Sequence, residues 1–156
     1  MKITKYLEVS TGHRLPIQND ICSNLHGHTY KLMINIEFYR QEDEYIDMGS
    51  FIDWQIIEKL LNKDFGHRYL ISKHDPIIKQ IKDLPGIRIV DYFPTSENIS
   101  KEMIDLISQE ILLEVRKKDI GHMSVRLKLS ETSNTSIDMQ RDFKINKRIH
   151  NTYVRQ

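Results

Sequence analysis

The sequence predicts an α+β domain, because its strand patterns and its helix patterns occupy separate parts of the chain. Residues 3–11, 28–39 and 124–131 carry alternating or β-favouring side chains. Residues 53–63 and 95–115 lie between them and show apolar residues at helical spacing. Strands that follow one another, with the helices together in the middle, favour an antiparallel sheet with helices on one face.

The composition narrows the class of protein. The chain has 156 residues, the size of one ordinary domain. Apolar residues make up 39%, charged residues 29%, and the net charge is +1, so we expect neither nucleic acid nor a membrane as a partner. Met1–Lys5 lead into a strand pattern rather than a signal peptide. Because Cys22 is the only cysteine, no intrachain disulfide can form, and we expect a cytoplasmic protein.

The first half of the chain is predicted to hold three strands and a helix. A polar loop at 14–25 separates the strands 3–11 and 28–39, and a short return strand is expected at 46–51. Asp53 is a suitable N-cap for the helix that follows. The apolar face of that helix is expected to consist of Ile56, Ile57, Leu60 and Leu61.

The second half begins with mixed patterns at 64–92. There, His74-Asp75-Pro76 favours the start of a short helix, Pro85-Gly86 breaks it, and Ile87–Val90 is predicted to be extended. Thr95 can cap the longest helix. Its apolar stripe is expected to contain Ile99, Met103, Ile104, Leu106, Ile107 and Ile111.

The C-terminal part is predicted to complete the sheet. Residues 124–131 alternate strictly, which is typical of a strand with one buried face, formed here by Val125, Leu127 and Leu129. A last strand is expected at 135–139. We therefore assign residues 1–140 to the domain and residues 141–156 to a basic tail.

The pattern His26-Gly27-His28 points most directly to chemistry. Side chains two positions apart on a strand point to the same side, so one metal ion can bind both imidazoles. A third imidazole from a neighbouring strand would give the open three-histidine site usual for catalytic zinc. Cys22, in the preceding loop, is a candidate nucleophile or proton carrier; its alternative role is that of a buried apolar side chain.

Several short motifs occur in the order of a known family. They are Gly12-His13-Arg14-Leu15-Pro16, Cys22 separated by three residues from His26-Gly27-His28, Phe51-Ile52-Asp53, Gly66-His67-Arg68-Tyr69-Leu70, Pro94-Thr95-Ser96-Glu97-Asn98 and Glu131-Thr132. With them the chain resembles the 6-pyruvoyltetrahydropterin synthase superfamily. The short spacing from Cys22 to His26 is closest to its bacterial branch, the 6-carboxytetrahydropterin synthases of queuosine (7-deazaguanine) biosynthesis.

The resemblance implies the tunnelling fold, a four-stranded antiparallel sheet with two helices on one face. It also implies homo-oligomers in which the sheets of a trimer form a continuous barrel and two trimers stack into a hexamer, with pterin sites between subunits. The implied substrate is a small molecule, 7,8-dihydroneopterin triphosphate. The implied activity is that of a lyase, with 6-carboxy-5,6,7,8-tetrahydropterin, triphosphate and acetaldehyde as products.

The resemblance also assigns roles to residues. His13, His26 and His28 would hold Zn²⁺, which would act as a Lewis acid on the substrate's side-chain hydroxyls. Cys22 would abstract a carbon-bound proton, for which its thiol needs a nearby cation or metal. His67 would transfer protons among the later steps.

Substrate binding is assigned to the second half of the chain. Glu131 would bind the guanidine-like edge of the pterin through its two oxygens, with a surface charge as its alternative role. Thr95, Ser96 and Glu97 are further candidates for substrate binding. The same three residues begin a helix, and a helix-capping carboxylate is the alternative role of Glu97.

The chain departs from the family at Gly66, where an aspartate normally precedes the histidine matched by His67. Such an aspartate would orient the imidazole, and Asp64 is a candidate substitute. The departure leaves a non-catalytic pterin-binding paralogue as an alternative to the enzyme. A pyruvoyl product is the alternative within the enzyme class. A zinc-dependent hydrolase or nuclease is a further alternative. It would leave Cys22 without a role, and the chain lacks the extra acidic ligands that a two-metal phosphodiesterase needs near the histidine pair.

Overall fold

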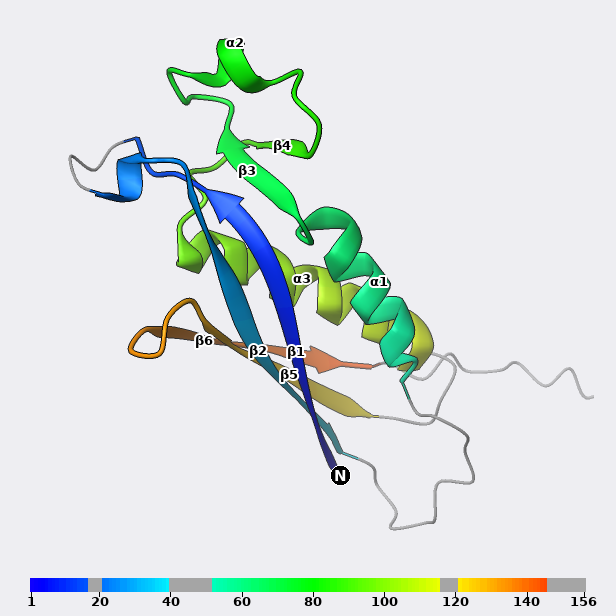
Figure 1. Cartoon of the computed structure of the whole chain (residues 1–156). Coiled ribbons are helices and arrows are strands. Elements are labelled where there is room, and N and C mark those ends of the chain that lie inside the picture. Colours follow the sequence, from blue (N-terminus) through cyan, green and yellow to red (C-terminus); the bar gives the residue numbers. More distant parts are fainter. Residues whose placement is uncertain (17–20, 40–51, 116–120, 146–156) are drawn as a thin grey trace, which may run out of the picture.

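The fold is seen in a computed structural model that describes residues 1–16, 21–39, 52–115 and 121–145. The return strand predicted at 46–51 lies outside the described residues. The elements are β1 (Lys2–His13), the 3-10 turn η1 (Ile21–Ser23), β2 (His26–Tyr39), α1 (Trp54–Asp64), β3 (Arg68–Ser72), α2 (Ile78–Ile81), β4 (Ile87–Val90), α3 (Ser96–Val115), β5 (His122–Ser130) and β6 (Ser136–Lys144). The predicted α+β class is confirmed (Figure 1).

The sheet is larger than the resemblance implied. Its described part has six strands in the order β4-β3-β1-β2-β5-β6. The four strands β1, β2, β5 and β6 pair antiparallel, as predicted. The expectation of a four-stranded, purely antiparallel sheet is wrong, because β3 runs parallel to β1 and β4 runs parallel to β3. Both added strands are short, and β3 pairs with only three residues of β1, from Thr11 to His13.

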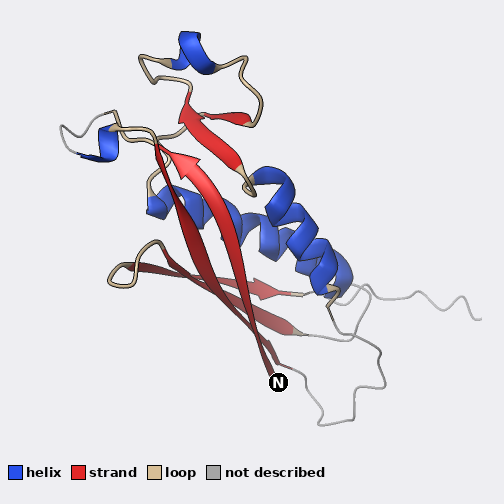
Figure 2. Ribbon diagram, viewed as in Figure 1, coloured by secondary structure: helices blue, strands red, loops and turns tan. Residues whose placement is uncertain are grey.

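Two of the three described helices cover one face of the twisted sheet (Figure 2). α1 packs near β1, and α3 packs over β5 and β6, while β3, β4 and the short α2 project from one end. Within the described helices, none is both long and apolar enough to span a membrane. The two long helices are those that the sequence predicted, and α2 is the short helix expected within 64–92.

Side-chain caps fix where the two long helices begin. The Asp53 carboxylate accepts a hydrogen bond from the backbone N–H of Gln55 at 2.9 Å, and the Thr95 hydroxyl accepts one from Asn98 at 3.3 Å. Both caps satisfy N–H groups that have no partner within their own helix. The predicted starts of α1 and α3 are therefore confirmed.

The core lies between the sheet and the two long helices. From α1 it includes Ile57 and Leu61, whereas Ile56 is 39% exposed, so the apolar face predicted for this helix was too wide. From α3 it includes five of the six predicted residues, all but the half-buried Leu106. The strands contribute mostly alternate residues, and the alternation predicted for β5 is confirmed from Val125 to Ser130, whereas Ser124 is buried as well.

The last strand is longer than the sequence predicted. β6 runs to Lys144, and its Arg141 side chain donates from Nε to the Asp105 carboxylate of α3 at 2.8 Å. Residues 141–144, predicted to begin the basic tail, are therefore part of the sheet. Residues 146–156 of that tail lie outside the described part of the chain.

The turn after α1 is built tightly around Gly66. A Cβ atom at this position would lie 2.8 Å from the backbone oxygen of Asn62 and 2.9 Å from its Cα. Real Cβ contacts do not approach backbone this closely, so a larger residue would push the turn away from α1. The glycine is therefore required by packing, not by a left-handed backbone.

We predict that Gly66→Ala lowers the free energy of unfolding by about 1–3 kcal/mol, the usual cost of overpacking. Urea denaturation followed by circular dichroism measures it. Gly121→Ala is the matched control, since the nearest atom to its Cβ would be an ordinary 3.9 Å away. Equal unfolding midpoints for the two variants would contradict the packing explanation.

Candidate functional site

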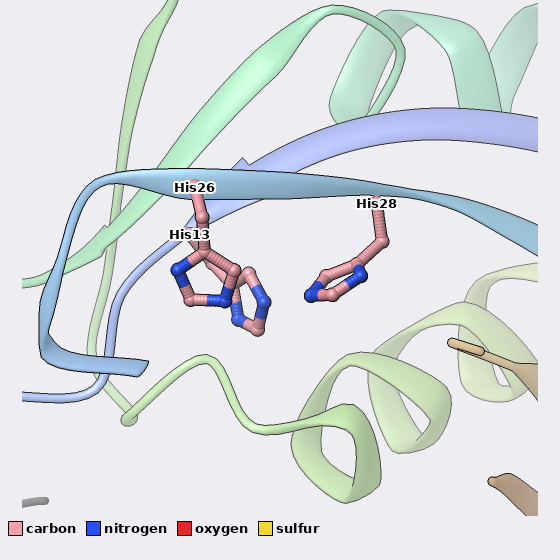
Figure 3. Close-up of side chains that lie close together, drawn as sticks. All are labelled: His13, His26 and His28. Atoms are coloured by element: carbon pink, nitrogen blue, oxygen red, sulfur yellow. The ribbon is translucent and has the colours of Figure 1, made fainter. Parts of the chain in front are cut away.

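Three imidazoles meet where β1 ends and β2 begins. His13 and His26 are directly opposite each other in the β1–β2 register, and His28 follows two positions along β2. One ring nitrogen from each lies within 4.8 Å of those from the other two. Figure 3 shows the three rings on the same side of the strands, directed toward the segment that leads into α3. The predicted convergence of these histidines is thus present in the structure.

Strand alternation explains why all three histidines share a face. His13 follows the buried Val9 and Thr11 of β1 at intervals of two residues. His28 precedes the buried Tyr30 of β2 in the same way. The histidines therefore continue the helix-covered face of the sheet, at the end where the apolar core gives way to a pocket.

Backbone carbonyls orient two of the rings. Nδ1 of His13 lies 2.6 Å from the carbonyl oxygen of Pro94, and Nδ1 of His26 lies 2.9 Å from that of Asn24. A carbonyl can only accept, so each Nδ1 carries a proton, and in the neutral form of each ring Nε2 keeps its lone pair. Histidines that bind metal usually have this kind of outer hydrogen bond, which fixes the ring and its tautomer. These donors therefore fit a metal ion.

Burial keeps His13 in the form that binds metal. Loss of solvent around this side chain, which is 2% exposed, lowers its pKa; the Pro94 carbonyl opposes that effect and the neighbouring His26 adds to it. A neutral imidazole is the form that coordinates Zn²⁺. His13 is thus neutral at pH 7 without any metal present.

One carboxylate lies beside the histidines. Oε1 of Glu131 is 3.6 Å from Nε2 of His13 and 3.7 Å from Nε2 of His28. The hydroxyl of Tyr30 donates to the same oxygen at 3.1 Å. Tyr30 is fully buried, and this burial, together with the charge of Glu131, raises the pKa of its hydroxyl far above the usual value. Tyr30 is therefore a constant hydrogen-bond donor to Glu131.

These groups line a pocket of about 650 Å³. It is bounded by the three histidines and by Cys22, Thr95, Ser96, Glu97, Glu131, Thr132 and Ile137, among others. The predicted metal ligands, the predicted base and all four predicted substrate-binding residues thus come together. They are brought from four separate parts of the chain, and a volume of this size suits a small organic molecule.

Two predicted residues lie elsewhere. His67 lines a second, shallower hollow of about 450 Å³ with Ser10, Gly12 and Thr29. By strand alternation these three residues face away from the helices, so this part of the hollow is on the opposite face of the sheet, while His28 borders both hollows. Among the described residues, no hydrogen bond or ion pair joins Asp64 to His67; the charge of Asp64 instead contributes to the raised pKa of Arg88.

The sequence interpretation missed two groups that contact His13. Tyr30 was treated only as part of a strand, although its position two residues after His28 places it on the same face. The carbonyl of Pro94 could not have been found, because the backbone carries no residue-specific pattern. Both lie against His13: the tyrosine hydroxyl is 3.5 Å from its Nε2.

Comparison with known proteins identifies the family. The sequence matches the 6-pyruvoyl tetrahydropterin synthase family over residues 2–152. The chain belongs to this family. It is 29% identical over 148 residues to the 6-carboxy-5,6,7,8-tetrahydropterin synthase of Rickettsia typhi, which covers 89% of this chain and 99% of that protein. The Bacillus subtilis protein of the same name is 27% identical over 90 residues, 57% of this chain and 59% of that protein.

Solved structures share the fold of the family. An uncharacterized protein from Wolinella succinogenes superposes with a TM-score of 0.61 at 17% identity, over 89% of this chain and 97% of that one. A 6-pyruvoyltetrahydropterin synthase variant from Plasmodium vivax gives a TM-score of 0.60 at 15% identity, over 92% and 99%. At these identities the likeness concerns the fold alone.

We predict that His26→Ala lowers zinc affinity at least about 10-fold, because even groups that only support a metal ligand contribute 10- to 100-fold. Competition with a chromophoric chelator measures the affinity of the purified protein. His74→Ala is the matched control, since His74 is exposed and outside the pocket. Equal affinity in the two variants would show that the histidine cluster does not hold the metal.

Proposed function

We propose that this protein is a zinc-dependent lyase that converts 7,8-dihydroneopterin triphosphate to 6-carboxy-5,6,7,8-tetrahydropterin, with release of triphosphate and acetaldehyde, in queuosine (7-deazaguanine) biosynthesis. The observation that carries the proposal is the meeting of three histidines, Cys22 and Glu131 in one pocket. The relatives named 6-carboxy-5,6,7,8-tetrahydropterin synthase, which align over most of the chain, support this product.

The residues of the pocket divide the chemistry between them. His13, His26 and His28 would hold zinc, which supplies Lewis acidity to the hydroxyls of the substrate when bound. Cys22 lines the same pocket as the histidines and serves as the base that removes a carbon-bound proton. Glu131, whose Oε1 is held by Tyr30, binds the N–H edge of the pterin.

Thr95, Ser96 and Glu97 close the pocket at the start of α3. We assign them to binding of the same substrate. The Thr95 hydroxyl also caps α3, and Glu97 lies in its first turn, so both residues combine a structural role with a position at the pocket.

His67 acts from a neighbouring subunit in this proposal. Its hollow lies on the sheet face away from the helices, so within one chain the sheet separates it from Cys22. Among the described strands, β4 forms one outer edge of the sheet. Two further stretches are open, namely the start of β1, which β3 does not reach, and the outer edge of β6. Edge-to-edge pairing of those stretches would build the barrel of the family, with a hexamer as the full assembly.

A pterin-binding protein without turnover is the second candidate, and Gly66 is the observation that favours it. An aspartate at this position would meet the backbone of Asn62, so the acid that normally supports His67 has no room. Asp64 remains the candidate substitute in the enzyme. Turnover that is unchanged in Asp64→Asn would exclude it from that role.

We predict that the zinc-loaded protein converts 7,8-dihydroneopterin triphosphate to the carboxy product. Mass spectrometry of the products measures this conversion and distinguishes the carboxy product from a pyruvoyl product by mass. Cys22→Ala should lower turnover by about 10²- to 10⁴-fold, the usual contribution of a general base, with zinc content unchanged. Tight pterin binding without product in the wild-type protein would favour the second candidate instead.

We also predict that Cys22→Ala and His67→Ala complement each other in mixed oligomers. Each variant alone is expected to be nearly inactive. After random assembly from equal amounts, roughly a quarter of the sites would pair an intact Cys22 with an intact His67 from the neighbouring subunit. The measurement is turnover of refolded or co-expressed mixtures carrying two different tags. No gain over the separate variants would mean that both residues act from one chain.

A further inference from the structure

The Glu131 carboxylate lies close to two of the histidine nitrogens that would bind the metal. Its Oε1 is 3.6 Å from Nε2 of His13 and 3.7 Å from Nε2 of His28. Two ligands on one tetrahedral zinc are separated by roughly 3.3–3.6 Å, given bonds of about 2.0–2.2 Å. The carboxylate oxygen is thus nearly at a ligand's distance from His13 and His28, and a movement of the side chain toward His26, which lies farther away, would complete the set of four ligands.

The surroundings hold this oxygen in place. The Tyr30 hydroxyl donates to Oε1 of Glu131 at 3.1 Å and comes from β2, the same strand as His28. Tyr30 is fully buried, so its hydroxyl cannot exchange this acceptor for bulk water. A metal-binding carboxylate commonly has such a hydrogen-bonded partner. The Glu131 side chain is 19% exposed, which leaves it accessible from the pocket.

We propose, on the premise of the proposed function that the histidines hold zinc, that Glu131 is the fourth metal ligand in the substrate-free protein and that the pterin removes it. One carboxylate cannot bind the metal and grip the N–H edge of the pterin through both oxygens at once. Pterin binding therefore opens the metal position that the hydroxyls of the substrate take. Glu131 thereby couples recognition of the pterin ring to access to the metal.

This coupling has a physical consequence for affinity. The pterin must break the Glu131–metal bond. Bound zinc therefore lowers the contribution of the carboxylate to pterin affinity, and bound pterin lowers its contribution to zinc affinity. By linkage, the penalty is the same in both directions. In exchange, a closed metal site binds adventitious water or anions less readily before the substrate arrives.

The test uses the full-length protein loaded with Co²⁺, whose visible absorption reports coordination geometry, and compares it with Glu131→Gln. We expect the variant to change the absorption bands and to raise the dissociation constant for Co²⁺ and Zn²⁺ about 10-fold or more. Glu110→Gln is the matched control. It removes the same charge from α3, outside the pocket. Circular dichroism checks that all variants are folded.

The second part adds 7,8-dihydroneopterin, which has the pterin ring and the side-chain hydroxyls but no triphosphate. Saturation is established by calorimetry, and the bands of the wild-type protein are expected to shift. The role of Glu131 as fourth ligand would be contradicted by equal absorption bands and equal metal affinities in wild type, Glu131→Gln and Glu110→Gln. If the absorption bands of the wild-type protein do not move at saturation, displacement of Glu131 by the pterin would be contradicted. Loss of metal binding in His26→Ala tests the histidine site separately, so failure of that site is distinguishable.

Discussion

The register between β1 and β2 is the constraint on which the site depends. It sets His13 opposite His26 and Thr11 opposite His28, so the three imidazoles share one face. A shift by one residue would turn the histidines of one strand to the opposite face, because side chains alternate with a period of two. The same register aligns the buried Tyr30 with Val9. The apolar pairing that stabilises the core thus also positions the three histidines.

At the site, the buried side chains of this layer change from apolar to polar. Moving from Val9 toward His13, the buried positions change to groups that have partners: the Thr11 hydroxyl donates to the Phe65 carbonyl at 2.9 Å, and His13 donates to Pro94. Buried polar groups are costly unless they are hydrogen-bonded. Satisfying them with the fixed backbone of the segments after α1 and before α3 stabilises both the fold and the ring orientations.

The turn at Gly66 and the added strands β3 and β4 determine where His67 lies relative to the pocket of the same chain. Gly66 lets the chain turn tightly against α1, and β3 then extends the sheet beside the end of β1. This path leaves His67 on the far face, away from the pocket that holds Cys22. The glycine at this position is therefore linked to packing, and substitution by aspartate would disturb the turn.

The sequence by itself determined the long elements and the shared face of His26 and His28, because their patterns are local. Caps at Asp53 and Thr95, alternation in β5 and the spacing of His26 and His28 each depend on neighbours in sequence. Only the tertiary structure decided the parallel strands β3 and β4, which are short and pair with segments distant in sequence. It also decided the contact of Glu131 with the histidines and the separation of His67 from them, since both follow from how distant segments pack.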